Sequence, residues 1–191
     1  MTTELHPLGF FLPENTRLLM LGSFPPPRAR WSMDFYYPNI QNDMWRILGL
    51  IFYGNKDAFL RDKKAFSEEK AKAFCREKGI GIGDTAMEVI RLKANASDKF
   101  LEVVRPIDPE KVLSQIPECV AIVVTGQKAM DTLLSVLPGT EEPKVGFSSE
   151  FFCMGRTMRL FRMPSSSRAY PKPLEEKAAI YRRMFETLGM V

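Results

Sequence analysis

Residues 17–27, RLLMLGSFPPP, pass from an arginine through four apolar residues to a glycine, a serine and a proline-rich loop. A short apolar run that ends at a glycine is typical of a buried β-strand. The prolines that follow stiffen the chain and cannot donate to a strand ladder. We therefore predict a strand over residues 17–21, with a rigid loop directly after its carboxyl end.

Strand-like and helix-like segments alternate along the rest of the chain. Residues 120–124, VAIVV, are continuously apolar and rich in β-branched side chains, as in a central parallel strand. A hairpin is expected over 150–163, with its turn at Gly155-Arg156. Capping signals such as Ser67 and Asp108 predict helices over about 44–53, 67–78, 108–116, 127–137 and 173–188.

This alternation predicts an α/β fold, a three-layer sandwich with a central, mostly parallel sheet of four or five strands flanked by helices. The 191 residues suit one domain, 1–191. Ligands of such sheets bind beyond the carboxyl ends of the strands. Four polar segments follow strand-like runs, and we expect them to meet at one edge of the sheet: GSFPPP, GDTAM, TGQKA and PSSSRAY.

The charge, cysteine and histidine content narrow the chemistry. A net charge of +4 and a pI of about 9.0 are compatible with a polyanionic partner. Three cysteines without a CxxC pair disfavour a disulfide framework, a zinc ribbon or an iron–sulfur cluster. The one histidine, His6, is near the N-terminus, so we expect no imidazole in the site, no Ser-His-Asp hydrolase and no His-rich metal site.

The distribution of apolar residues gives no sign of a membrane protein. The chain has no run of 18 or more apolar residues. Its first residues, MTTELHPLGFF, lack the basic start and long apolar core of a signal peptide. We therefore expect a cytoplasmic protein with reduced thiols and no membrane association.

The loop over residues 22–45 combines a glycine, stacking side chains and an amide. Gly22 lets the backbone approach a ligand, and Phe24, Tyr36 and Tyr37 offer flat faces on which a base could stack. Asn42 is a neutral amide at an expected helix start, where it could orient a water. A long surface loop with an ordinary N-cap asparagine is an equally open interpretation.

Three further segments each have a functional and an ordinary interpretation. Residues 165–168, SSSR, suit a phosphate-binding loop, or a solvated turn. Asp84 ends the strand GIGIGD and could accept hydrogen bonds from a base, or cap the next segment. Lys128 lies at an expected helix start and could assist anion binding, although TGQKA lacks the spacing of a P-loop.

Together, these segments resemble motifs of the uracil-DNA glycosylase superfamily, closest to its hypoxanthine-DNA glycosylase branch. GSFP, then YYPNIQNDMW, then PSSSRA follow the order and separation of the branch's motifs, and TGQKA resembles a segment between them. The resemblance covers about residues 17–188.

The resemblance implies roles for particular residues. Asn42 matches the catalytic asparagine, and Asp84 stands where the superfamily has a base-reading asparagine. An asparagine amide both donates and accepts, whereas an ionised aspartate only accepts, so the base that would be excised stays open. The base pocket would contain Gly22, Ser23, Phe24, Pro25, Tyr36, Tyr37 and Asp84, and DNA would be bound by Ser165, Ser166, Ser167, Arg168 and Lys128.

The implied activity is that of a monofunctional DNA glycosylase in base excision repair. It would flip a deaminated base, uracil or hypoxanthine, out of DNA and hydrolyse its N-glycosidic bond. The resemblance implies no metal, no cofactor and no obligate protein partner, and members of the superfamily commonly act as monomers. A nucleotide- or anion-binding protein of the same fold is the alternative. A serine hydrolase using Ser166 is disfavoured because GxSxG is missing.

Overall fold

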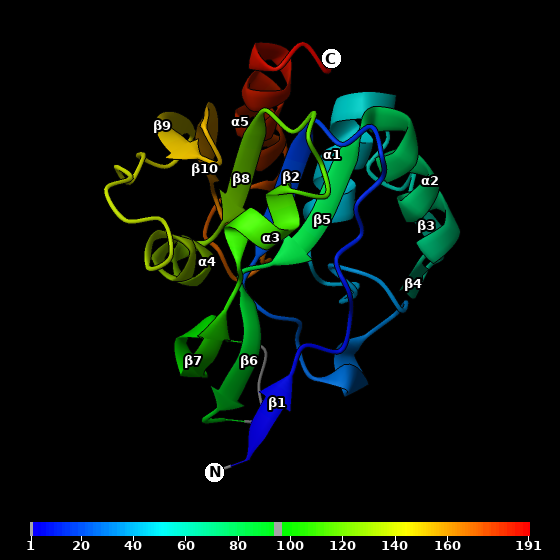
Figure 1. Ribbon diagram of the computed structural model, residues 1–191. Coiled ribbons are helices and arrows are strands. Elements are labelled where there is room, and N and C mark those ends of the chain that lie inside the picture. The colour runs from blue at the N-terminus through cyan, green and yellow to red at the C-terminus, as the bar shows by residue number, and fades with distance from the viewer. Residues whose placement is uncertain (1, 94–96) are drawn as a thin grey trace.

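The computed structural model describes residues 2–93 and 97–191. At its centre is a five-stranded mixed sheet with the strand order β5-β2-β8-β10-β9 (Figure 1). Strands β2 (Leu18–Gly22), β5 (Ile80–Asp84), β8 (Ala121–Thr125) and β10 (Arg156–Met163) pair in parallel, and β9 (Phe147–Cys153) runs antiparallel to β10. The predicted α/β architecture is therefore confirmed.

Two hydrophobic cores cover the two faces of this sheet. Leu18 and Met20 of β2 face the core that includes α1 (Met44–Tyr53), α2 (Glu68–Lys78) and α5 (Leu174–Thr187). Leu19 and Leu21 face the core that includes α3 (Pro109–Leu113) and α4 (Gln127–Leu134). Because successive side chains of a strand point to opposite faces, one apolar run contributes to both cores. The result is the expected arrangement of helices, sheet and helices.

Helix ends follow the local capping signals. The Ser67 side chain accepts a hydrogen bond from a backbone N–H in the first turn of α2, and Asp108 does the same for α3. Helix α3 is shorter than predicted, because the chain continues from Ser114 as turns. The hairpin turn lies at Met154-Gly155, one residue before the predicted position, and both residues have positive φ values of 53° and 76°. Two-residue hairpin loops commonly require this conformation.

Two smaller sheets have no counterpart in the sequence-based prediction. One is an antiparallel sheet of β1 (Thr3–Leu5), β6 (Ala86–Arg91) and β7 (Leu101–Pro106). It extends away from the main sheet past the carboxyl end of β5 (Figure 1). Strands β3 (Leu60–Asp62) and β4 (Ala65–Phe66) form a short hairpin, and two 3₁₀ turns, η1 (Arg28–Arg30) and η2 (Asp98–Phe100), lie in loops. Through β1, the N-terminal segment reaches the carboxyl end of β5.

The three cysteines are free and buried. Burial raises the pKa of the Cys75 thiol to about 12 and that of Cys119 to about 11, so these thiols stay protonated and unreactive near neutral pH. Within residues 2–93 and 97–191, no helix has both the length and the apolar character needed to span a membrane.

Candidate active site

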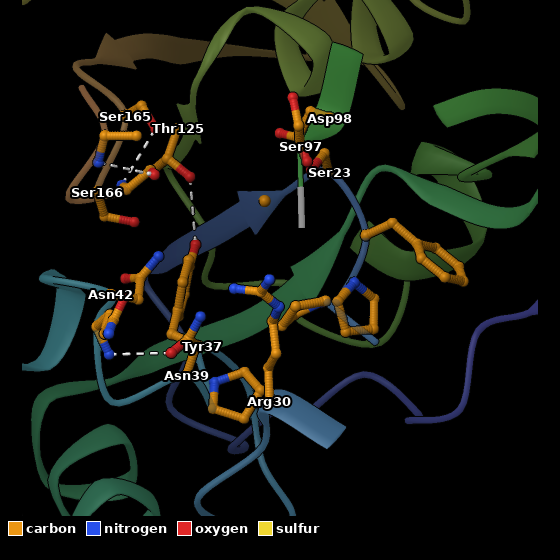
Figure 2. Close-up of a pocket in the computed structure, with 18 of the residues that line it drawn as sticks. Ser23, Arg30, Tyr37, Asn39, Asn42, Ser97, Asp98, Thr125, Ser165 and Ser166 are labelled. Atoms are coloured by element: carbon orange, nitrogen blue, oxygen red, sulfur yellow. Dashed lines mark hydrogen bonds between the residues drawn. The ribbon is translucent and has the colours of Figure 1, made fainter. Parts of the chain in front are cut away.

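Four segments that follow strands of the main sheet meet around one cavity of about 590 Å³ (Figure 2). Gly22 pairs with Asp84, and Met163 pairs with Thr125, so the carboxyl ends of the parallel strands are level. The volume lies within the range of small-molecule sites. All but one of the predicted site residues line the cavity: Gly22, Ser23, Phe24, Pro25, Tyr36, Tyr37, Asn42, Asp84, Ser165, Ser166, Ser167 and Arg168.

Asn42 stands at one end of the cavity, two residues before the first residue of α1. Its Oδ1 accepts a hydrogen bond of 2.9 Å from the N–H of Met44, which caps the helix and fixes the side chain. Asp43, the N-cap residue by position, makes no side-chain bond to the helix. The amide oxygen of Asn42 retains a second lone pair, and the amide nitrogen carries two donors. The side chain faces the cavity close to Tyr37 and Ser166, where it can hold a water (Figure 2).

A buried ion pair ties the Asn42 loop to the serine loop, residues 164–169. The Nζ of Lys177 in α5 is fully buried, lies 3.2 Å from Oδ2 of Asp43 and donates to the Ser167 carbonyl at 2.8 Å. The Asp43 N–H also donates to the Ser166 carbonyl at 2.8 Å. A buried ammonium is tolerated where it is paired and hydrogen-bonded. This network holds the two loops in one relative position.

Hydrogen bonds within the serine loop add to these contacts. The Ser165 hydroxyl accepts from the Ser167 N–H at 3.2 Å, and the Ser167 hydroxyl accepts from a backbone N–H two residues further on. Ser166 is almost fully buried, whereas Arg168 is exposed at the rim with its Nε 3.6 Å from Oδ1 of Asp43. Hydroxyls and an arginine at the rim of a cavity are suited to contact phosphate oxygens.

The two tyrosines have different positions. Tyr37 adopts a left-handed backbone conformation with φ of 52°, and its hydroxyl lies 3.4 Å from that of Thr125. Burial, and then the nearby charge of Asp84, raise the pKa of the Tyr37 phenol, so it stays a hydrogen-bond donor. Tyr36 is nearly buried and donates to the Gly9 carbonyl at 3.0 Å. Tyr37 therefore offers its hydroxyl to the cavity, while Tyr36 mainly supports the wall.

The imidazole of His6 does not line the cavity, but it contacts a residue that does. His6 lies directly after β1, and its Nε2 is 2.7 Å from Oδ2 of Asp84, with side-chain exposures of 4% and 8%. The imidazole packs against Phe24 and Tyr36, with ring centroids 5.2 and 5.8 Å away. The nitrogens of His6 bond to Asp84 and to the backbone of Leu8 rather than to a serine. The contact therefore places an imidazole behind a wall of the cavity without creating a serine triad.

A second carboxyl group lies at the other end of the cavity, and sequence reasoning missed it. Asp98 lies there with Ser97 and Ser23, across from Asn42 (Figure 2). Burial raises the pKa of the Asp98 carboxyl, and the hydrogen bond with Ser23 opposes this shift. Asp98 is the first residue of η2, and the sequence around it has no motif that distinguishes it from an ordinary loop, so only the fold identifies this acid.

Basic side chains approach the cavity to different degrees. Arg30 and Lys99 line it. Lys128 lies in the first turn of α4 and is not part of the lining, but its charge opposes the rise that burial causes in the pKa of Asp98. A DNA-binding role for Lys128 stays a prediction. In the part of the chain that the structure describes, no three His, Cys, Asp or Glu residues are arranged to hold a metal ion.

Comparison with known proteins identifies a shared fold. No protein-family model and no curated protein matches this chain. The structure is similar to the solution NMR structure of "a putative uracil DNA glycosylase" from Methanosarcina acetivorans, with a TM-score of 0.62. The two chains are 24% identical, and the match covers 93% of this chain and 96% of the other.

Proposed function

We propose that this protein is a monofunctional DNA glycosylase that releases a deaminated base, uracil or hypoxanthine, from DNA. The observation that supports this best is the meeting of Asn42, Asp84 and the serine loop around one cavity large enough for a nucleoside. The name of the solved structure with a similar fold, a putative uracil DNA glycosylase, agrees with this proposal.

The substrate nucleotide would leave the duplex and enter the cavity. Extrusion costs a few kcal/mol, and less for a mispaired base such as a deaminated one. Stacking on an aromatic side chain recovers about 1–3 kcal/mol. The serine loop, which includes Arg168, lies at the rim, where it would contact the phosphates that flank the extruded nucleotide.

Hydrolysis would then break the N-glycosidic bond. The electron pair of the C1′–N bond leaves with the base, and C1′ passes through an oxocarbenium-like state. A water held by Asn42 adds to C1′ and loses a proton, while the base gains one, which gives a free base and an abasic sugar. An amide is a poor base, but water that attacks an oxocarbenium needs mainly to be positioned.

The proposed mechanism is that of a monofunctional enzyme, because the water held by Asn42 attacks C1′ and no lysine is needed as a nucleophile. The Lys177 ammonium is fully buried and bound to Asp43 and Ser167, so it is not free to attack the sugar. We propose that residues 1–191 form a single catalytic domain that acts as a monomer in the cytoplasm, without cofactor, metal or obligate protein partner, in base excision repair.

Base release from defined duplexes tests this proposal. Duplexes that carry uracil, hypoxanthine, xanthine or only normal bases are incubated with protein and treated with alkali, which breaks the strand at abasic sites. The matched control for Asn42→Ala is Asn55→Ala, because the exposed Asn55 accepts an equivalent 2.9 Å bond from the N–H two residues on, outside the cavity.

We expect wild type and Asn55→Ala to release at least one deaminated base, and Asn42→Ala to be at least 100-fold slower while still binding the duplex. Release that is unchanged in Asn42→Ala would contradict the catalytic assignment. Binding without release from any lesion would instead favour the alternative, a nucleotide- or anion-binding protein of the same fold.

A further inference from the structure

We propose that His6 is a positioning residue that holds Asp84 as a hydrogen-bond acceptor, so that the cavity selects bases with a ring N–H facing Asp84. This inference rests on the proposed function and specifies its substrate class. The chemical class is a lactam base, in which the ring N–H lies beside a carbonyl; uracil and hypoxanthine share this group with thymine and guanine, so the contact separates each deaminated base from the cytosine or adenine that it derives from.

The two carboxylate oxygens of Asp84 have different surroundings. Oδ2 is occupied by Nε2 of His6 at 2.7 Å. Oδ1 borders the space above Gly22, because a Cβ built on Gly22 would lie 2.6 Å from Oδ1 and 3.5 Å from the Tyr37 hydroxyl. All three of Gly22, Tyr37 and Asp84 line the cavity. The glycine thus leaves room for the Asp84 carboxylate itself, so that Oδ1 can lie against the Gly22 backbone at the wall of the cavity.

The imidazole is held so that Nε2 faces Asp84. Leu8 presents its carbonyl oxygen 2.8 Å and its N–H nitrogen 3.1 Å from Nδ1 of His6, so Nδ1 has a partner whether or not it carries a proton. The ring is enclosed by Phe24 and Tyr36, and strand β1 is fixed by its pairing with β6. Nε2–H can therefore donate to Oδ2 in either charge state of the ring, which leaves Oδ1 to accept from a ligand.

This arrangement has a direct consequence for the base. An ionised carboxylate oxygen accepts hydrogen bonds and cannot donate them. N3–H of uracil or N1–H of hypoxanthine would donate to Oδ1 of Asp84, and the Tyr37 hydroxyl could donate to the adjacent carbonyl. At the same ring position, cytosine and adenine carry a lone pair, which the carboxylate would repel. A base that cannot donate this hydrogen bond leaves the buried Asp84 carboxylate without a partner, and such a loss discriminates strongly between ligands.

The test compares hypoxanthine with 1-methylhypoxanthine, which keeps the carbonyl but lacks the ring N–H. Each is placed opposite an abasic site so that neither is base-paired. Single-turnover release is measured for wild type, His6→Phe and Glu4→Gln. His6→Phe keeps a ring between Phe24 and Tyr36 but removes the Nε2 donor. Glu4→Gln is the control, because it weakens a different contact of strand β1, the ion pair with Arg91.

We expect wild type and Glu4→Gln to release hypoxanthine at least tenfold faster than the methylated base. His6→Phe should lower the hypoxanthine rate at least tenfold and bring the ratio close to one, and His6→Gln, which retains an N–H donor, should recover part of it. An equal loss on both bases in His6→Phe would mean that His6 has only a structural role. A ratio that stays unchanged because His6→Phe slows neither release would mean that the methyl group excludes the base by size, and either result overturns the proposal.

Binding separates this proposal from the proposed catalysis. The affinities of Asn42→Ala and of Asn42→Ala/His6→Phe for the same two duplexes are measured without turnover. A preference for hypoxanthine that His6→Phe abolishes would support base reading even if the wild type released no base. Equal affinity of Asn42→Ala for both duplexes would refute base reading by Asp84, whatever the outcome of the release assay.

Discussion

Replacing Lys177 by methionine would leave the buried carboxylate of Asp43 without its ammonium partner. Removal of one member of a buried ion pair typically costs about 3–5 kcal/mol, because the remaining charge stays desolvated. Here the Arg168 guanidinium remains 3.6 Å from the other oxygen of Asp43, but its side chain is 54% exposed and its attraction is screened by solvent. We therefore expect a loss of about 3 kcal/mol in the free energy of unfolding.

Urea unfolding of four proteins measures this effect: wild type, Lys177→Met, Asp43→Asn and the double variant. The double variant should be more stable than Lys177→Met alone, because no unpaired carboxylate remains. The four free energies of unfolding form a double-mutant cycle, which yields the coupling energy between Lys177 and Asp43. Lys72→Met is the control, since Lys72 pairs with Glu68 on a helix surface, where the loss should be below about 1 kcal/mol. A cost for Lys177→Met no larger than that of Lys72→Met, or strictly additive effects in the cycle, would refute the reasoning.

Three further predictions concern the cavity. Gly22→Ala should slow single-turnover base release at least tenfold, because its methyl group would lie 2.6 Å from Asp84 Oδ1. Gly9→Ala is the control and should leave the rate unchanged, because no atom lies within 4 Å of the Cβ position at Gly9. Equal rates for the two variants would contradict this prediction. Because burial raises the pKa of Asp98, the contribution of Asp98 to stability should fall as pH rises above about 3.9, the unfolded value. In urea unfolding, Asp98→Asn should then be more stable than wild type at pH 7 and as stable as wild type near pH 4. An Asp98→Asn variant that is less stable than wild type at pH 7 would exclude a destabilising effect of the ionised Asp98. Arg168→Ala should weaken binding to damaged and undamaged duplexes alike and lower the slope of log K against log salt by about 0.9, so an unchanged slope would rule out a phosphate contact.

The parts of the fold that sequence reasoning predicted correctly are those with local signals. The apolar run at 18–21 identified a buried strand, because the parallel strand it forms is covered on both faces. Ser67 and Asp108 marked helix starts, because a capping bond joins residues three positions apart. The meeting of four loops at one sheet edge followed from the parallel topology alone.

The parts that were missed depend on contacts between distant segments. His6 and Asp84 are 78 positions apart, and no periodicity or spacing connects them. Their contact depends on the pairing of β1 with β6, and β6 lacks the strict alternation of buried and exposed residues that identifies a half-buried strand. Asp98 enters the cavity from a short 3₁₀ turn, an element with a weak sequence signal.

The most direct measurement is the crystal structure of Asn42→Ala bound to a duplex that carries the released lesion. Since this variant should bind without turnover, the substrate should be captured intact. The account predicts the damaged nucleoside outside the duplex and within the cavity, its base against Asp84 and its C1′ facing residue 42. A lesion that remains stacked in the duplex, or a duplex bound on another face of the protein, would contradict it.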